Sequence, residues 1–269
     1  IDSLIRKYGW DSNVVRVRVR GEFPNQEDDV FIPLSLIEQC SSKLLELDDA
    51  DGMQFVSLGV DVARFGDDET IIYRNYHGHC KIVRNRRGQN LMATVGDIVQ
   101  EFKKIYREHP TYESKVYVQI DDTGLGGGVT DRLKEVRKEQ KLYKMQVIPI
   151  NAAEKIETDT AAGKDAAERY NNLTTAMWAS MRDLLDNKQI VIEDDEQTIG
   201  QLSSRKYTMA SNGKLEIEPK KEMKKRGLDS PDRADALALA LYLGKIKKHT
   251  GSAPSVGAMK KLSKDNYWG

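Results

Sequence analysis

The chain has 269 residues, of which 39% are hydrophobic and 31% charged, a composition typical of a globular protein and not of a disordered or fibrous one. Its 42 basic and 42 acidic residues cancel to a formal charge of zero, which argues against a simple nucleic-acid coat protein and leaves any polyanion to local basic patches. Cys40 and Cys80 are too few for a disulfide framework, and no apolar run approaches the roughly 20 residues that span a bilayer.

The first 50 residues are predicted to be a lead-in and not a domain of their own. They contain an alternating stretch, RVRVRGEF at 16–23, which is typical of a strand, and a short amphipathic helix within 33–47. The opening residues lack the basic-then-apolar order of a secretion signal, so we expect a protein that is not secreted. Because the chain opens at Ile1 and not at a methionine, we also expect a fragment or a processed product.

Residues 51–247 are predicted to form one α/β domain. Three short strands, FVSLGVDVA (55–63), ETIIYRN (69–75) and CKIVRN (80–85), follow one another with polar turns between them and predict an antiparallel meander. A helix over 91–106, a strand over 115–120, a helix over 129–140 and a strand over 144–150 then alternate. This alternation predicts parallel pairing through a crossover, so the sheet is expected to be mixed and flanked by helices.

The second half of the chain is predicted to be more helical. An apolar stripe over 166–184 indicates one long amphipathic helix, and the Asn-Gly pair at 212–213 between two alternating segments indicates a β-hairpin. The last helix is expected to have Ser230 as its N-cap and Pro231 at its first helical position. Residues 248–269 lack periodicity and are expected to be a C-terminal tail.

Carboxylates stand where three of these elements begin or end: Asp61 in the first strand, Asp121 and Asp122 after the strand over 115–120, and Asp232 and Asp235 in the last helix. A buried carboxylate is costly unless it is neutralised, and hard cations such as Mg²⁺ or Mn²⁺ prefer oxygen ligands. Taken alone, Asp61 also fits a turn hydrogen bond, and Asp232 fits a helix-dipole complement. Together the acids predict a site for two such ions, which would hydrolyse a phosphodiester.

Within the pair at 121 and 122 we favour Asp121 as the ligand. Neighbouring residues on a strand face opposite sides, so only one of the two can share the face of Asp61. Asp122 is then expected to be a structural partner or a loop cap. Asp235 lies one turn after Asp232 on the same side of the helix and is expected to be an additional or supporting ligand.

Two other motifs carry less weight. The glycine-rich stretch TGLGGG (123–128) could cradle a dinucleotide, but its third fingerprint position is Val129, two carboxylates precede it, and the next strand lacks the ribose-binding acid. His77 and His79 have a spacing that could bind a metal, yet they flank a glycine in a predicted turn, which favours a solvated turn. The chain has no GxxxxGK[ST] motif and so cannot be a P-loop ATPase by itself.

Two basic clusters are candidates for contact with a nucleic-acid backbone. One lies after the meander, and the other directly precedes the last helix. Runs of charged residues commonly form solvent-exposed surfaces, so each cluster taken alone could be such a surface with no contact to nucleic acid. On either side of a carboxylate site they would suit a duplex whose phosphate is brought to the metal ions. The candidate residues are Arg84, Arg86 and Arg87 in the first cluster, and Lys220, Lys221, Lys224, Lys225 and Arg226 in the second.

Three segments resemble, in order and spacing, the nuclease domain of tailed-phage large terminase subunits, the motors that package and cut viral DNA. They are GVDVARFGDDETII (59–72), VYVQIDDTGLGGGVTDRL (116–133) and KKEMKKRGLDSPDRADALALA (220–240). The resemblance covers about residues 55–245. The lead-in is similar to the segment that joins the terminase ATPase to its nuclease, so residues 1–50 are expected to be a linker from an ATPase domain that this chain lacks.

The resemblance implies an RNase H-like fold with an extra β-hairpin, placed to touch DNA. It also implies an endonuclease that uses Mg²⁺ or Mn²⁺ to cleave concatemeric double-stranded viral DNA during genome packaging. By position, Asp61 would bridge two ions, Asp121 would bind one from the adjacent strand, and Asp232 would bind from the last helix. Asp67 matches a family acid that adds to or regulates the site. The implied partners are double-stranded DNA, the small terminase subunit and the portal protein, in the host cytoplasm.

Two alternatives stay open at this point. The chain could be another RNase H-like nuclease, such as a junction resolvase, which would prefer four-way junctions over linear duplex. It could also be a non-catalytic DNA-binding or docking module whose acids are structural. Metal-dependent cleavage of a plasmid separates the module from the nucleases.

Overall fold

The computed structural model describes residues 5, 10, 15–16, 19–22, 29–42, 46–47, 53–63, 68–152, 154–158, 161–242 and 244. Its main sheet has six strands in the order β5-β4-β1-β2-β3-β6. The strands are β1 (Val56–Asp61), β2 (Thr70–Tyr76), β3 (His79–Arg86), β4 (Val116–Asp121), β5 (Met145–Ile150) and β6 (Val191–Ile192). β1, β2 and β3 pair antiparallel, β4 pairs parallel with both β1 and β5, and β6 pairs parallel with β3. The predicted meander with added parallel strands is therefore confirmed.

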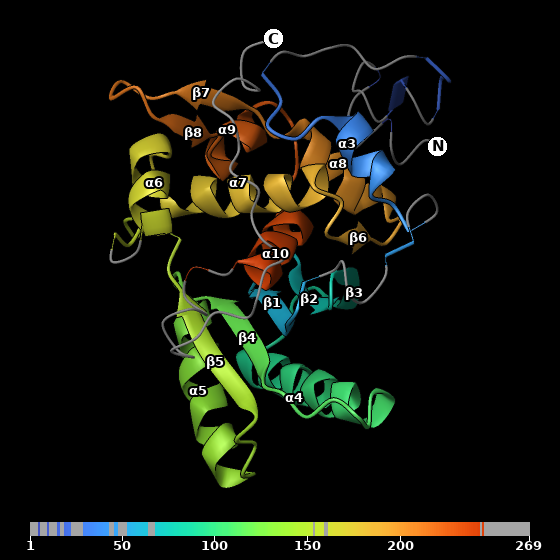
Figure 1. Cartoon of the computed structure of the whole chain (residues 1–269), viewed down its shortest axis with the longest axis vertical. Coiled ribbons are helices and arrows are strands. Elements are labelled where there is room, and N and C mark those ends of the chain that lie inside the picture. Colours follow the sequence, from blue (N-terminus) through green and yellow to red (C-terminus); the bar gives the residue numbers. More distant parts are fainter. Residues whose placement is uncertain are drawn as a thin grey trace.

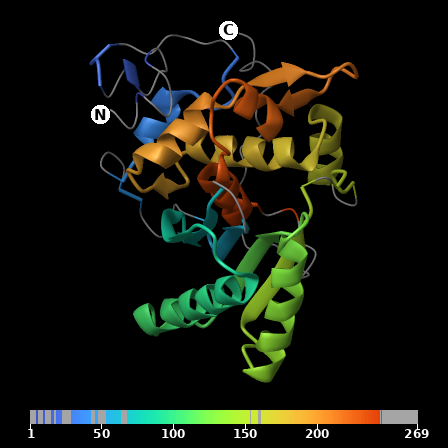
Figure 2. The same ribbon diagram turned by 180° about the vertical axis from the view of Figure 1, so that it is seen from behind.

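Helices cover both faces of this sheet (Figures 1 and 2). On one face, α4 (Leu91–Glu108) and α5 (Gly126–Glu139) share an apolar core with the central strands. On the other face, α10 (Asp232–Leu241) lies on β1 and β2, and α7 (Leu173–Asp186) packs on α10. The chain also forms α3 (Leu34–Gln39), α6 (Ala161–Arg169), α8 (Glu196–Ser204) and α9 (Lys220–Lys225). The result is the predicted α/β architecture.

A separate hairpin, β7 (Tyr207–Met209) and β8 (Leu215–Ile217), lies on the far side of α7 from the main sheet (Figure 1). Its two strands flank the Asn-Gly pair at 212–213, so the predicted hairpin is confirmed. No helix in the described ranges combines the length and the apolar character that crossing a membrane requires. The predicted tail, 248–269, lies outside the described residues.

α10 lies so close to β1 that their backbones touch. A Cβ atom on Gly59 would lie 2.1 Å from the carbonyl oxygen of Ala236 and 2.3 Å from the nitrogen of Ala240, so only glycine fits in β1 at this point. One turn further along the helix, the Ser57 hydroxyl donates to the Ala240 carbonyl oxygen at 2.5 Å. Ser57 contacts Ala240, and Gly59, two residues later in β1, contacts Ala236, which is earlier in α10. The strand and the helix therefore run in opposite directions. The start of α10 therefore lies over the end of β1, where Asp61 stands.

The strand predicted over 16–23 is wrong for the described residues. Val15 and Arg16 are helical, and Val19 and Arg20 both donate their backbone N–H groups to the Val15 carbonyl in a turn. These local hydrogen bonds satisfy backbone groups that a strand would have to pair with a neighbouring strand. The predicted helix within 33–47 is confirmed but covers only α3.

The single helix predicted over 166–184 is also wrong, because two helices, α6 and α7, carry its apolar stripe. Between them Tyr170 forms a bridge with Leu215 of the hairpin, and the Asn172 side chain accepts a hydrogen bond from the Thr175 N–H as the N-cap of α7. A capping asparagine starts a new helix more favourably than it continues an old one. Both helices keep their apolar faces, which is why the periodicity alone did not show the break.

Candidate metal centre at the carboxyl end of the sheet

Two of the predicted acids end neighbouring parallel strands. Asp61 is the last residue of β1 and Asp121 is the last residue of β4, and the register that pairs Val60 with Ile120 sets these two acids side by side. Residues in register on adjacent strands share a face of the sheet. Asp61 and Asp121 therefore face the same side, as predicted, and Asp122 lies just beyond the end of β4.

α10 brings two more acids to the same place. Asp232 is its first residue and Asp235 is its fourth, so both belong to the first turn, which lies over the end of β1. The Glu69 backbone N–H donates to Asp232 Oδ2 at 2.9 Å and fixes this carboxylate from the loop that precedes β2. The helix begins one residue later than predicted, with Pro231 as its N-cap, and the Ser230 side chain hydrogen bonds to Asp232 instead of capping the backbone. This correction leaves the acids in place.

The ammonium group of Lys220 stands among these carboxylates. Its Nζ lies 3.0 Å from Asp235 Oδ2, 3.1 Å from Asp61 Oδ2 and 3.5 Å from Asp232 Oδ1. Lys220 is the first residue of α9, a short helix that enters from the hairpin side. Three acids from two elements thus share one positive charge.

The electrostatics of the cluster follow from burial and mutual repulsion. Burial raises the pKa of Asp61 to about 7, and although Lys220 opposes this rise, Asp232, Asp235 and Asp121 add to it. Burial also raises the pKa of Asp232. Burial lowers the pKa of Lys220, but the attraction of Asp61, Asp235 and Asp232 outweighs it, so the net pKa lies well above the usual value and the side chain is a cation. Burial and mutual repulsion therefore disfavour the charged forms of Asp61 and Asp232, and additional positive charge would favour them.

Asp235 behaves differently from its neighbours. Burial favours its neutral form, but Lys220, Arg205 and the Trp178 side chain together outweigh burial and hold the pKa of Asp235 below its usual value. The Arg205 Nη1 and the Trp178 Nε1 each donate to Asp235 Oδ1 at 2.8 Å, whereas Oδ2 faces Lys220. Asp235 is thus the carboxylate with a fixed orientation and a stable negative charge.

The acids after β4 are arranged around the start of α5. Asp121 Oδ1 accepts a hydrogen bond from the Thr123 N–H, and one oxygen of Asp122 is buried without a hydrogen-bond partner. The glycine-rich stretch is not an open loop, because α5 begins at Gly126, three residues earlier than predicted. A Cβ atom on Gly126 would lie 1.6 Å from the Asp121 carbonyl oxygen, so this glycine lets the helix start directly against the strand end. Asp67 lies outside the described residues.

In the part of the chain that the structure describes, no three aspartate, glutamate, histidine or cysteine side chains are already grouped around a position open to a metal ion. The position shared by Asp61, Asp232 and Asp235 is taken by the Lys220 ammonium. The donors are nevertheless carboxylate oxygens, which hard divalent cations prefer, and they already gather around a positive charge. The Lys220 side chain is 38% exposed, and lysine has a long stem with several rotatable bonds, so the ammonium is able to withdraw toward solvent. The residues therefore fit Mg²⁺ or Mn²⁺ in exchange for Lys220.

A cleft of about 490 Å³ opens beside Asp232, which is the one acid of the cluster among its lining residues. Its wall includes Arg87, which pairs with Glu69 at 2.9 Å, and Lys224, which pairs with Asp68 at 3.1 Å. Both cations are exposed, so these ion pairs contribute little to stability and exchange readily. The cleft thus combines an opening beside Asp232 with two basic side chains among its lining residues.

The remaining predicted basic residues differ in their surroundings. Arg84 is committed to the fold, because it pairs with Asp97 and with the buried Glu101. Arg226 pairs with Glu218 and donates to the Ser204 carbonyl oxygen. Exposed positions are held by Arg86, Lys221 and Lys225, the last of which pairs with Glu222.

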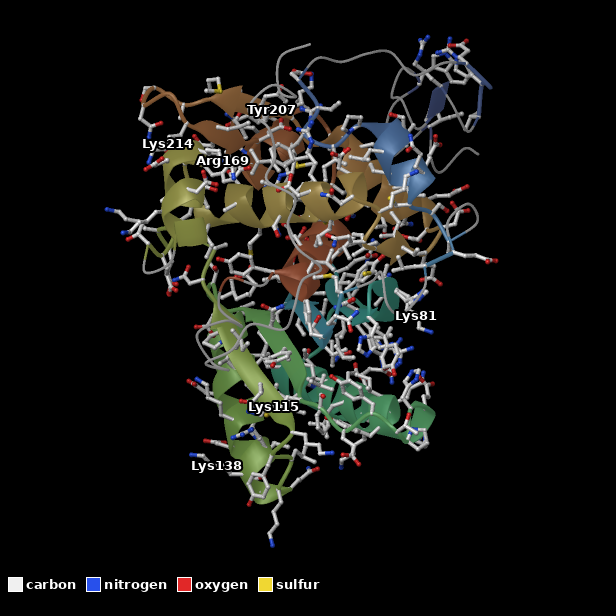
Figure 3. All side chains as sticks on the ribbon, in the orientation of Figure 1. Lys81, Lys115, Lys138, Arg169, Tyr207 and Lys214 are labelled. Atoms are coloured by element: carbon white, nitrogen blue, oxygen red, sulfur yellow. The ribbon has the colours of Figure 1, made fainter. Side chains whose placement is uncertain are left out.

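The site lies near the middle of the molecule. Figure 3 labels Tyr207 and Lys214 on the hairpin at one end and Lys138 on α5 at the other, and α10 lies between these ends in Figure 1. The structure brings Asp61, Asp121, Asp232 and Asp235 together, and places Lys220 among the acids and not on an outer surface.

Sequence reasoning did not single out Arg205, Trp178 or the Glu69 N–H. For Trp178 a signal existed, since a tryptophan on a buried helix needs an acceptor for its indole N–H. Arg205 and Glu69 gave no comparable signal, because their contacts with α10 join residues that are far apart in the chain.

The fold is an RNase H-like α/β fold, with a mixed sheet, helices on both faces and an added hairpin. The nuclease domain of the large terminase subunit gp2 of bacterial virus Sf6 has a similar structure, with a TM-score of 0.59, 17% identity, and coverage of 79% of this chain and 98% of that chain. A point variant of that domain with manganese and beta-thujaplicinol gives a TM-score of 0.60 at 18% identity, covering 79% of this chain and 98% of that chain. A variant with calcium gives 0.62 at 16% identity, covering 79% and 99%. No family model and no curated protein sequence matches the chain.

Proposed function

We propose that this chain is the nuclease domain of a phage large terminase subunit, a metal-dependent endonuclease that cleaves concatemeric double-stranded DNA during genome packaging. The observation that carries the proposal is the convergence of three carboxylates, from β1 and the first turn of α10, around the Lys220 ammonium, with Asp121 of β4 beside Asp61. The similar fold of the Sf6 terminase nuclease domain supports it, and a structure of that domain contains manganese. Buried acids of this number need a cation, and an open cleft beside Asp232 supports access to them.

The chain would hold two Mg²⁺ or Mn²⁺ ions through Asp61, Asp121 and Asp232, with Asp235 as a further ligand and with Asp67 and Asp122 as additional candidates. Such ions, when bound, activate a water molecule and stabilise the leaving oxygen in phosphodiester hydrolysis. Asp61 lies between the other acids and is suited to bridge. The Glu69 N–H orients Asp232, and Lys220 keeps the acids together in the absence of the ions.

The substrate would approach along the cleft beside Asp232. Lys224 and Arg87 at the cleft, with Lys221, Lys225 and Arg86 on exposed positions nearby in the chain, would contact phosphates after exchanging their present partners. These contacts would be independent of base sequence, because they address only the backbone.

In the intact motor, residues 1–50 would link this domain, 51–247, to an ATPase domain, and 248–269 would follow as a tail. The partners would then be the small terminase subunit and the portal protein, in the host cytoplasm. Cutting by this chain alone would not require translocation.

The test is plasmid cleavage with Mg²⁺ or Mn²⁺ by the unmodified chain and by Asp61→Asn, Asp121→Asn and Asp232→Asn. We expect metal-dependent cleavage that each substitution reduces by at least about 100-fold, because each removes a metal ligand. Asp131→Asn is the matched control, since Asp131 is 81% exposed on α5, and it should cleave like the unmodified chain.

The same assay separates the alternatives. Unchanged cleavage in all three variants would refute the mechanism, and binding of DNA without metal-dependent cleavage would favour a docking module. Faster cleavage of four-way junctions than of linear duplex would favour a junction resolvase.

A further inference from the structure

The two oxygens of the Asp235 carboxylate have different partners. Oδ1 accepts two hydrogen bonds of 2.8 Å, from Arg205 Nη1 and from Trp178 Nε1, and Oδ2 is left to face Lys220. The two donors come from different elements, since Trp178 lies in the middle of α7 and Arg205 is the C-cap of α8. This arrangement fixes the plane of the carboxylate and directs one oxygen toward the other acids.

Arg205 is itself held rigidly. Its side chain is 3% exposed, its guanidinium carbon lies 4.6 Å from the centre of the Trp178 ring, and its Nε donates to the Glu218 carbonyl oxygen at 2.9 Å. A planar guanidinium that stacks on an aromatic ring and uses its donors in fixed directions is not interchangeable with lysine. Burying such a cation is costly, and the cost is offset only where its partners stay in place.

The backbone around Arg205 is fixed by the segment that precedes α3. The Phe31 N–H donates to the Arg205 carbonyl oxygen at 2.8 Å, and the Tyr207 N–H donates to the Asp29 carbonyl oxygen at 2.9 Å. The Phe31 ring also meets the Trp178 ring edge-on at 6.4 Å. The hairpin, on which Figure 3 labels Tyr207, is therefore joined through its base to the residues that hold Asp235.

We infer that Arg205 and Trp178 are positioning residues of the proposed metal site, which act through Asp235 by presenting its Oδ2 as a fixed, negatively charged ligand. This inference rests on the proposed function, because it takes Asp235 as a ligand of the ions. Groups that orient metal ligands in this way typically contribute a factor of about 10 to 100 in metal affinity.

The experiment is a calorimetric titration of the full chain with Mn²⁺, using Trp178→Phe, Asp235→Asn and the double variant. Trp178→Phe keeps an aromatic ring beneath Arg205 but removes the indole N–H together with part of the buried ring, and we expect its affinity for Mn²⁺ to fall by about 10-fold. If Trp178 acts through Asp235, the same change should have no further effect in the Asp235→Asn background. Arg205→Lys should weaken binding at least as much, because lysine cannot reproduce the directed donors.

The outcomes separate this inference from the proposed function. If the unmodified chain does not bind Mn²⁺, both fall. If the unmodified chain binds Mn²⁺ and Trp178→Phe binds it equally well, only the inference is overturned. The same holds if Trp178→Phe lowers the affinity equally in the unmodified chain and in the Asp235→Asn variant. Should a variant fail to fold, a Mg²⁺ titration of the tryptophan indole N–H resonances in the unmodified chain decides. The Trp178 resonance is assigned by replacing Trp10 and Trp268. We expect it to shift as Mg²⁺ is added and to reach a plateau at saturation, and an unmoved resonance would overturn the inference.

Discussion

Replacing Asp61 by asparagine (Asp61→Asn) should make the metal-free protein more stable at neutral and alkaline pH. Burial, opposed by Lys220 but reinforced by neighbouring acids, raises the pKa of Asp61 from 3.8 to about 7. A carboxyl group with a raised pKa in the folded state binds its proton more tightly there than in the unfolded chain. Its favourable contribution to folding is therefore complete below the unfolded pKa and is lost as the pH rises toward 7.

The size of this loss follows from the pKa difference. About three pKa units, at 1.36 kcal/mol each, correspond to a penalty on the order of 4 kcal/mol at about pH 8. Asparagine resembles the neutral acid and escapes the penalty. For a chain of this length we expect the melting temperature of Asp61→Asn to exceed that of the unmodified protein by roughly 10 °C at about pH 8. The two melting temperatures should approach each other at about pH 4.

The assay is thermal unfolding in the presence of a chelator, followed by circular dichroism between about pH 4 and 8 in both proteins. The exposed Asp131→Asn serves as the control and should show no pH-dependent difference. A melting temperature of Asp61→Asn that is equal or lower at pH 8, or a difference that does not shrink on acidification, would contradict the argument. Saturating Mn²⁺ should stabilise the unmodified protein more than the variant, because binding to the folded state adds stability by mass action.

Three further predictions concern the cation, the helix contact and the substrate path. Lys220→Gln should bind Mn²⁺ about 10-fold more tightly in calorimetry, because the ammonium no longer competes for the same oxygens, and weaker binding would contradict this. Gly59→Ala should lower the free energy of unfolding in urea by about 3 kcal/mol or more, whereas Gly96→Ala, which meets nothing within 4 Å, should not be destabilising. The double variant Lys224→Ala, Lys225→Ala should reduce the slope of the logarithm of the DNA-binding constant against the logarithm of salt concentration by up to about two. An unchanged slope would show that both lysines face solvent and do not contact DNA.

Most of the sheet could be predicted because its strands are nearly continuous apolar runs with turns between them. β1 is buried along its whole length, and the pattern that predicted it over 55–63 gave its position to within two residues. The errors fall where local hydrogen bonds decide the structure. The Asn172 side chain caps α7 and divides a stripe whose periodicity is unbroken, and turn bonds to the Val15 carbonyl replace a strand. Periodicity reports which face is buried and not where the backbone turns.

In the proposed site, too, some residue positions could be predicted from the sequence and others could not. The direction of the chain places Asp61, Asp121 and the start of α10 at one end of the sheet, so their approach could be predicted from element order alone. The position of Lys220 could not. It precedes Asp232 by 12 residues and reaches the acids only because α9 folds back from the base of the hairpin, and a run of basic residues gives no sign of which member turns inward.

Lys220 is expected to stabilise the metal-free fold and, at the same time, to lower the affinity for metal ions. The buried acids need positive charge for the chain to fold before any metal is bound, and a tethered ammonium supplies it at 3.0 to 3.5 Å from three carboxylates. The same oxygens are the proposed metal ligands, so the ion pairs between Lys220 and these three carboxylates must be broken when an ion enters. Substitutions at position 220 should therefore raise metal affinity and lower metal-free stability together, and a variant that lost stability without any gain in metal affinity would show that the ammonium and the ions occupy different places.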